Sequence, residues 1–285
     1  MIIKEDFDLT MNNSYRVRSF CKRAFFPEFI EDFEALALND GFKDKVVIGR
    51  GYNLILANEY YDKDFIIIAD SFSKVEIIED KIIGDAGADM FVLSQMALDN
   101  SLTGLEYFYD IPGSFGGAIV MNAGSNNVEI KDLLIRAKYL DINTGLIGYL
   151  DHHDIDFSYR DSFFQRNPSC IVLSGEMKLK HSSSSEIYSK MLDIKKKRNF
   201  KQPKEFPNAG SVFKRPEGKF VGPMIEDLGL KGFSIGGAQV SKKHAGFIVN
   251  KGGATGHDIV SLIDYIIEKV YGEYGVKLEV EQRII

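Results

Sequence analysis

The sequence predicts a mixed fold of helices and strands, of the α+β or mixed α/β class. Short β-branched runs alternate with segments of helical periodicity through the first half of the chain. A glycine-rich stretch from Gly104 to Gly124 occupies the centre, and no self-similar period typical of a solenoid or propeller is present. At 285 residues the chain approaches the size at which single cores divide, so we expect two or three structural units.

The first half contains strand-like runs that end at Gly, Asp or Ser, and helix-like segments lie between them. Strands are predicted at 45–48, 66–69 and 81–84, and helices at 28–38 and 89–99. The apolar stripes of the two helices are Phe29, Phe33, Leu36 and Leu38 in the first, and Phe91, Leu93, Met96 and Leu98 in the second. Such stripes predict one buried face on each helix.

The second half contains further strands and two longer helices. The later predictions are strands at 133–141, 170–179 and 245–250, helices from 186 to about 198 and from about 257 to 274, and a closing strand at 277–285. The run His181-Ser-Ser-Ser-Ser185 is a polar joint of low complexity before the first of these helices. It therefore marks the best domain boundary, between 1–184 and 185–285.

Composition excludes several classes of protein. A formal net charge of -6 gives no overall attraction to nucleic acid or to anionic lipid. No apolar run is long enough to span a membrane, and the first residues lack the pattern of an export signal, so a cytoplasmic location is expected. Cys21 and Cys170 are expected to be reduced structural thiols, and neighbouring His152 and His153 lack the spacing of a metal site.

The chain carries one concentrated basic run, Lys195-Lys-Lys-Arg198, at the end of a predicted helix. A solvated helix face or a partner of the helix dipole is the most economical interpretation. A role near an anionic substrate is the alternative, followed by contact with nucleic acid.

Two glycine-rich motifs suit a phosphorylated or planar cofactor. The first, Gly49-Arg-Gly-Tyr-Asn53, follows a predicted strand, where tight glycine turns expose backbone N–H groups to phosphate. An ordinary turn between strand and loop is the alternative, because Leu54 stands where a dinucleotide fingerprint needs its third glycine. The second, from Ile111 to Gly124, permits close backbone approach, although a buried crossing of two layers would use the same residues.

Longer motifs resemble one enzyme family. The segment Gly104-Leu-Glu-Tyr, Ile111-Pro-Gly-Ser-Phe-Gly-Gly-Ala and Asn122-Ala-Gly124 is similar to the flavin-contacting core of the UDP-N-acetylenolpyruvoylglucosamine reductases. Further matches follow in family order at 157–162, 202–203, 207–216, 229–241, 244–250 and 278–283. Together they cover roughly residues 45 to 285. The short interval between Arg160 and Ser211 resembles the family variant that lacks an extra loop with a substrate-contacting tyrosine.

The resemblance implies a fold and a reaction. It implies a vanillyl-alcohol-oxidase-like (PCMH-like) FAD-binding domain at 1–184, with parts at about 1–70 and 71–184, and a substrate-binding α+β domain at 185–285. It also implies that NADPH reduces FAD, which then passes a hydride to the enol ether of UDP-N-acetylglucosamine-enolpyruvate to give UDP-N-acetylmuramate. The implied partners are these small molecules, without nucleic acid or membrane insertion.

Three residues match the catalytic positions of the family. Hydride addition to an enol ether with a carboxylate places negative charge on the α-carbon and the carboxylate. Arg160 matches the residue that stabilises this charge, Ser211 the proton donor to the α-carbon, and Glu281 a glutamate near the substrate carboxylate. The alternatives are an ion pair of Arg160 with Asp161 or another carboxylate, a turn or cap role for Ser211, and a solvated strand face for Glu281.

The remaining predicted site residues bind cofactor or substrate. The cofactor set is Gly49, Arg50, Gly51, Tyr52, Asn53, Gly113, Ser114, Gly116, Gly117, Asn122, Ala123 and Gly124. The substrate set is Lys214, Arg215 and His244. No residue is predicted to bind a metal.

The chain departs from the family pattern at three places. Arg18-Ser19 replaces a glycine pair, Tyr52 replaces a small serine, and Gln282 replaces the valine in the pattern Leu-Glu-x-Glu-Val-Arg. The first two departures fall in the predicted FAD-binding part. They favour two alternatives to the active reductase, namely a diverged flavoprotein paralogue with another acceptor, and a non-catalytic nucleotide-sugar-binding protein that has lost FAD.

Overall fold

The structure is a computed structural model that describes residues 1–38 and 45–285. These residues form two compact units. The first comprises residues 1–4, 23–50 and 63–197, and the second comprises residues 5–22, 51–62 and 198–285. This division assigns most of the helix after residue 184 to the first unit, whereas the sequence predicted a domain boundary there.

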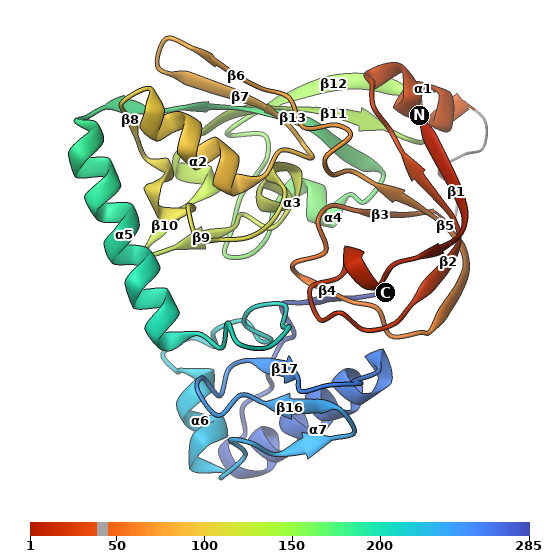
Figure 1. The fold of residues 1–285 in the computed structure, drawn as a ribbon, viewed down its shortest axis with the longest axis vertical. Coiled ribbons are helices and arrows are strands. Elements are labelled where there is room, and N and C mark those ends of the chain that lie inside the picture. Colours follow the sequence, from red (N-terminus) through yellow and green to blue (C-terminus); the bar gives the residue numbers. More distant parts are fainter. Residues whose placement is uncertain (39–44) are drawn as a thin grey trace. The chain divides into compact units, whose positions relative to one another are not determined.

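A five-stranded antiparallel sheet dominates the first unit (Figure 1). Its strands, in spatial order, are β12 (Leu146–Asp151), β11 (Leu134–Asp141), β13 (Cys170–Lys178), β7 (Lys81–Asp85) and β6 (Val75–Ile78). Helices α2 (Met90–Asp99) and α3 (Phe115–Val120) pack on this sheet and bury its apolar face. Short strands β8 (Leu102–Thr103) and β14 (Lys180–His181) pair beside α2.

A second sheet has the strand order β1-β2-β5-β3. Its strands are β1 (Ile2–Asp8), β2 (Phe20–Phe26), β5 (Tyr60–Ile67) and β3 (Val46–Ile48). The predicted strand at 45–48 is confirmed as β3, which pairs in parallel with β5. Three of the five boundaries between the two units fall within β1, β2 and β5.

The first unit contains further helices, strands and turns. They are α1 (Ile30–Leu38), α4 (Phe163–Arg166), α5 (Ser184–Lys201, of which the first unit contains residues up to 197), β9 (Gly124–Ser125), β10 (Val128–Glu129) and the 3-10 turns Leu105–Tyr107 and Ile130–Asp132. The basic run at the end of α5 lies on an exposed face, where Lys197 pairs with Asp193 at 2.6 Å. This exposure is consistent with the solvated-face interpretation, and a role near an anionic substrate stays a prediction.

The second unit contains a small sheet and two helices. Strand β16 (Ala238–Val240) lies between β15 (Ser234–Ile235) and β17 (Ile248–Asn250), with antiparallel pairing on both sides. Helix α7 (Gly256–Tyr274) packs on β15 and β16, and α6 (Val221–Asp227) packs on α7. Strands β4 (Leu54–Ile55) and β18 (Arg283–Ile284) pair in parallel, and a 3-10 turn covers Thr10–Asn12.

Two sequence predictions about local structure are wrong in detail. The predicted closing strand at 277–285 is a regular strand only at β18, because only Arg283 and Ile284 pair with β4. The predicted apolar stripes are also only partly buried. Phe29, Leu38 and Phe91 are 58%, 80% and 45% exposed. Phe29 precedes the first residue of α1 and Leu38 is its last, while Phe91 adjoins Met90 and lies off the buried face that Met90, Leu93 and Ala97 form.

Helix α7 begins with a capping box, which makes a local test of the fold possible. The Thr255 hydroxyl accepts the N–H of Asp258 at 3.1 Å, and the Asp258 carboxylate accepts the N–H of Thr255 at 3.0 Å. Thr255→Ala is expected to lower the free energy of unfolding by about 1 kcal/mol in urea titration, because it leaves an N–H without its cap. Glu273→Ala, at an exposed position near the other end of α7, should change it by less than about 0.5 kcal/mol. Equal losses in both variants would contradict the capping role.

Candidate active site

The predicted site residues are distributed over both units. The first unit contains Gly49, Arg50, Gly113, Ser114, Gly116, Gly117, Asn122, Ala123, Gly124 and Arg160. The second contains Gly51, Tyr52, Asn53, Ser211, Lys214, Arg215, His244 and Glu281. The structure therefore groups Ser211 with Glu281, and Arg160 with the longer glycine-rich motif.

Arg160 lies in a tight turn. The backbones of Ser158 and Asp161 exchange two hydrogen bonds of 3.1 and 3.2 Å across it, and Arg160 adopts a positive φ of 56°. Such a conformation is uncommon for a residue with a side chain and is typical of functional sites. The guanidinium is only 18% exposed and donates to Asn122 O at 3.3 Å and Gly124 O at 3.1 Å.

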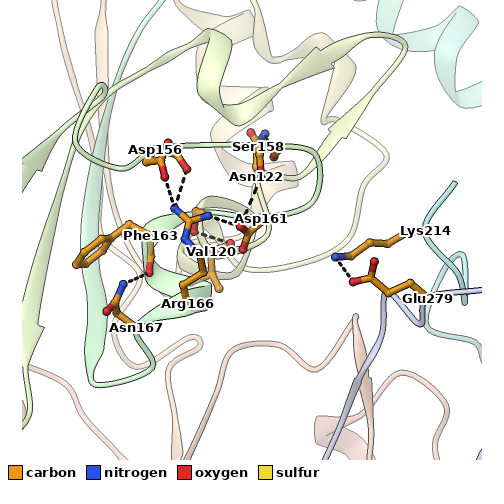
Figure 2. Close-up of polar contacts among 11 residues, drawn as sticks. Val120, Asn122, Asp156, Ser158, Asp161, Phe163, Arg166, Asn167, Lys214 and Glu279 are labelled. Carbon is orange, nitrogen blue, oxygen red and sulfur yellow. Dashed lines mark hydrogen bonds and ion pairs between the residues drawn. The ribbon is translucent and has the colours of Figure 1, made fainter. Parts of the chain in front are cut away.

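The alternative role of Arg160, an ion pair with Asp161 or another carboxylate, is represented in the structure by a contact with Glu129. Arg160 Nη1 lies 3.6 Å from Glu129 Oε1, whereas Asp161 pairs with Arg166. Figure 2 shows Arg166 between Asp156 and Asp161, with 2.8 Å to Asp156. Arg166 thus links Asp156 and Asp161, which precede and follow Arg160 in this loop.

The Asn122 side chain bonds to this loop and to two neighbouring residues. This side chain is buried and donates to Ser158 O at 2.9 Å and to Glu129 at 3.1 Å, while its oxygen accepts the N–H of Lys131 at 3.1 Å (Figure 2 shows the contact with Ser158). An amide has two donor hydrogens, and both are used here. The side chain predicted to contact the cofactor therefore holds the turn of Arg160, and the backbone oxygens of Asn122 and Gly124 accept hydrogen bonds from the Arg160 guanidinium.

The two glycine-rich motifs meet in the first unit. A Cβ at Gly49 would lie 2.2 Å from Ser114 Oγ, and one at Gly116 would lie 2.7 Å from the Cβ of Ala86. Both positions therefore require glycine for close packing. Gly113 is different, because its φ of 148° is a glycine conformation and a Cβ there would meet no described atom within 4 Å. The space that a side chain would fill at Gly113, next to Ser114 in the chain, is thus open.

Arg50 carries an unsatisfied donor at this junction. Its guanidinium pairs with Asp70 and, at 3.3 Å, with Asp89, yet its Nε is buried and finds no hydrogen-bond acceptor among the described residues. Buried donors are rarely left in this state without a ligand or water. An anionic oxygen at this position would satisfy it, so the donor set fits a phosphorylated cofactor.

In the second unit, Ser211 and Glu281 lie on neighbouring extended segments. The Glu281 N–H donates to Val212 O at 2.8 Å, and the Lys214 N–H donates to Glu279 O at 2.9 Å. On the other side of the Ser211 segment, the Val212 N–H donates to Gly246 O at 3.0 Å. Ser211 is exposed and Glu281 half-buried. Residues far apart in the chain thus form three adjacent segments around the predicted proton donor.

The second part of the shorter glycine motif adjoins these segments. Asn53 Nδ2 donates to Glu281 O at 3.1 Å, and the Arg283 N–H donates to Asn53 O at 3.0 Å. A Cβ at Gly51 would overlap Asn12 O, so this position requires glycine, while Tyr52 is 40% exposed. The predicted cofactor residue Asn53 therefore lies beside the predicted catalytic Glu281.

The predicted substrate residues surround the same segments. Lys214 forms an ion pair of 2.6 Å with Glu279 (Figure 2), and Arg215 stacks on Phe220 with 4.6 Å between its guanidinium carbon and the ring centroid. The His244 Nδ1 accepts the N–H of Gly246 at 3.1 Å. Burial, with a contribution from Lys231, lowers the pKa of His244, so its ring is neutral at pH 7 with the proton on Nε2.

Three side chains that build these sites were not predicted in that role. Glu129 pairs with Arg160, Tyr15 is buried against Gln282, and Gln282 bonds to the backbone beside Ser211. Of these three, Gln282 gave a signal in the sequence, because it replaces the valine of the family pattern. Glu129 and Tyr15 could not be found, since their partners are distant in the chain.

Residues 1–38 and 45–285 contain neither a metal-ligand cluster nor a membrane-spanning helix. No group of three or more His, Cys, Asp or Glu side chains is arranged to hold a metal ion. No helix has both the length and the apolar character that crossing a bilayer requires. Both cysteines are free thiols, as the sequence predicted.

Comparison with known proteins identifies relatives along the entire chain. The family model for the C-terminal domain of UDP-N-acetylenolpyruvoylglucosamine reductase matches residues 202–285. The reductases of that name from Syntrophomonas wolfei and Francisella tularensis are 38% and 39% identical, over 99% of this chain and 95% and 100% of their own lengths.

A solved structure agrees with these relatives. The crystal structure of UDP-N-acetylenolpyruvylglucosamine reductase (MurB) from Thermus caldophilus matches with a TM-score of 0.84 and 29% identity, over 100% of this chain and 99% of that one. This match confirms the predicted α+β fold class. The sequence relatives and the shared fold lead to one conclusion: the chain belongs to the family of UDP-N-acetylenolpyruvoylglucosamine reductases.

Proposed function

We propose that this chain reduces the enolpyruvyl ether of UDP-N-acetylglucosamine-enolpyruvate to UDP-N-acetylmuramate in peptidoglycan precursor synthesis, with FAD as cofactor and NADPH as electron donor. One observation carries the proposal. The hydrogen bond from the Glu281 N–H to Val212 O, 2.8 Å long, holds the predicted carboxyl group next to the segment of the predicted proton donor Ser211. The names of the relatives support the same reaction.

The residues present fit FAD. The buried Arg50 Nε lacks an acceptor among the described residues, and the space that a side chain would fill at Gly113 is open. These groups would hold the diphosphate and the adjoining parts of the cofactor through charge and backbone contacts. When bound, FAD supplies the hydride chemistry, as acceptor from NADPH and donor to the substrate.

Three side chains are assigned to the substrate. Arg160 holds the substrate carboxylate and stabilises the negative charge that develops there. The Ser211 hydroxyl gives its proton to the α-carbon, which is a strong base at that stage, so a weak acid held at contact distance suffices. Glu281 donates a hydrogen bond to the carboxylate, since a carboxyl group beside an anion gains proton affinity. Lys214, Arg215 and His244 are assigned to substrate binding.

The proposed partners are small molecules. They are the UDP-sugar substrate and NADPH, and the family resemblance implies that the reaction occurs in the cytoplasm. A net charge of -6 gives no support to a role in binding nucleic acid.

The half-reactions of the purified protein test the proposal. The protein should be yellow, its flavin bands should bleach when NADPH is added without oxygen, and they should return when UDP-N-acetylenolpyruvoylglucosamine is added. A flavin that NADPH reduces but this substrate fails to reoxidise would instead support a paralogue with another acceptor. A colourless protein that takes up no FAD would overturn both interpretations and favour a binding protein that has lost the cofactor.

A further inference from the structure

A buried amide lies beneath the segment that carries Ser211. The Gln282 side chain is only 4% exposed, and its Nε2 lies 3.0, 3.2 and 3.4 Å from the carbonyl oxygens of Ala209, Gly210 and Ser211. Its Oε1 accepts the hydroxyl of Tyr15 at 2.9 Å. One side chain therefore contacts three consecutive peptide groups that end at the predicted proton donor.

The orientation of this amide follows from its surroundings. Carbonyl oxygens only accept hydrogen bonds, so the NH₂ end of Gln282 must face residues 209–211 and its oxygen must face Tyr15. Tyr15 is fully buried, and burial raises the pKa of its hydroxyl, which stays protonated and donates. All polar atoms of the Gln282 amide are thus satisfied, as a buried polar network requires.

The same network reaches the start of the segment. Asn250 Nδ2 donates to Tyr15 O at 2.9 Å, and the Asn250 N–H donates to Pro207 O at 2.9 Å. Gly210 lies between these anchors with a φ of 82°, which is a turn conformation with little intrinsic preference for one position. The direction of the peptide before Ser211 therefore depends on the contacts that hold it.

Consecutive residues of the closing segment hold this peptide from two directions. The Glu281 backbone binds Val212 on one side of Ser211, and the Gln282 side chain binds residues 209–211 on the other. Proton transfer to carbon requires accurate placement, because a displacement of about 1 Å can cost about 100-fold in rate. A valine, the usual residue of the family pattern, would leave the three carbonyl oxygens without this donor.

We infer that Gln282, oriented by Tyr15, is a positioning residue that aims the Ser211 hydroxyl at the substrate. The inference rests on the proposed function, since it takes Ser211 as the proton donor. Gln282 lies on the buried face of the segment and acts only through the backbone of residues 209–211.

The test is a double-mutant cycle between Gln282 and Ser211. Gln282→Met keeps the length of the side chain and removes its amide. In the wild-type background it should slow reoxidation of the reduced flavin by UDP-N-acetylenolpyruvoylglucosamine by about 10-fold or more, while flavin reduction by NADPH changes by less than about twofold. In the Ser211→Ala background it should have an effect below about twofold, because no hydroxyl remains to be aimed.

Tyr15→Phe provides the second variant and removes a single buried oxygen. It should slow the same half-reaction by a smaller factor, about threefold, and should also lose its effect in the Ser211→Ala background. The inference would be overturned if Gln282→Met slowed flavin reoxidation equally in the wild-type and Ser211→Ala backgrounds. It would also be overturned if the variant slowed both half-reactions equally, or if Gln282→Met and Tyr15→Phe both kept wild-type rates. If Gln282→Met fails to fold, the Tyr15→Phe cycle decides by the same criteria.

Failure of the proposed function has a different signature. In that case the flavin of the wild-type protein would already resist reoxidation by the enolpyruvyl substrate. The positioning inference fails by itself if the wild-type protein turns over the enolpyruvyl substrate and the effects of Gln282→Met and Ser211→Ala on reoxidation are additive.

Discussion

Ser211→Ala is expected to reduce the rate of flavin reoxidation by UDP-N-acetylenolpyruvoylglucosamine by about 10²- to 10⁴-fold, the usual contribution of a positioned acid or base. Alanine has no proton to give to the α-carbon. The backbone contacts of the segment, from Val212 to Gly246 and from Glu281 to Val212, do not use the hydroxyl and should survive. Rapid-mixing absorbance of the flavin, measured separately for each half-reaction, is the appropriate measurement.

The controls for this variant separate chemistry from folding. Reduction of the flavin by NADPH should change by less than about twofold, because it requires no proton from Ser211. Ser234→Ala removes an exposed hydroxyl of the same unit and should leave both half-reactions at wild-type rates. A Ser211→Ala protein that reoxidises at the wild-type rate would remove Ser211 from the mechanism.

Local signals in the sequence were sufficient for the longer elements. Helix α2 begins one residue after Asp89, whose side chain accepts the N–H of Phe91, and α7 begins at the capping box of Thr255. Both helices lie within two residues of their predicted bounds, because caps and apolar periodicity act over short distances. The predicted closing strand was too long, since strand pairing depends on a partner that its own residues do not reveal.

The site was predictable as a set of residues but not as a set of contacts. Motif resemblance identified Arg160, but its carboxylate partner is Glu129, which lies in a separate strand, and not the adjacent Asp161. Gln282 was identified as a departure from the family pattern, yet its contacts with residues 209–211 appear only in the fold. The spacing of residues along a chain predicts which face of a helix or strand a side chain occupies. Hydrogen-bond partners from distant segments can be identified only once the fold is known.

Arg160→Ala is expected to lower the rate of flavin reoxidation by the enolpyruvyl substrate by about 10²- to 10³-fold, the usual effect of removing one donor from an anion-stabilising site. Arg160→Lys should recover only part of this loss, because an ammonium group cannot reproduce the planar fork of a guanidinium. Arg136→Lys is the matched control for Arg160→Lys, since Arg136 pairs with Glu176 in the central sheet of the first unit.

The steady-state constants should distinguish Arg160 from Ser211. The substrate carboxylate is already charged before the reaction, so Arg160 binds both the ground state and the transition state, and its loss should raise KM as well as lower kcat. Ser211 acts only as the α-carbon is protonated, so its loss should lower kcat with little change in KM. An Arg160→Ala variant with an unchanged KM for the enolpyruvyl substrate would contradict the assignment of its guanidinium to the carboxylate, and would favour a structural role through contacts such as those with Glu129, Asn122 and Gly124.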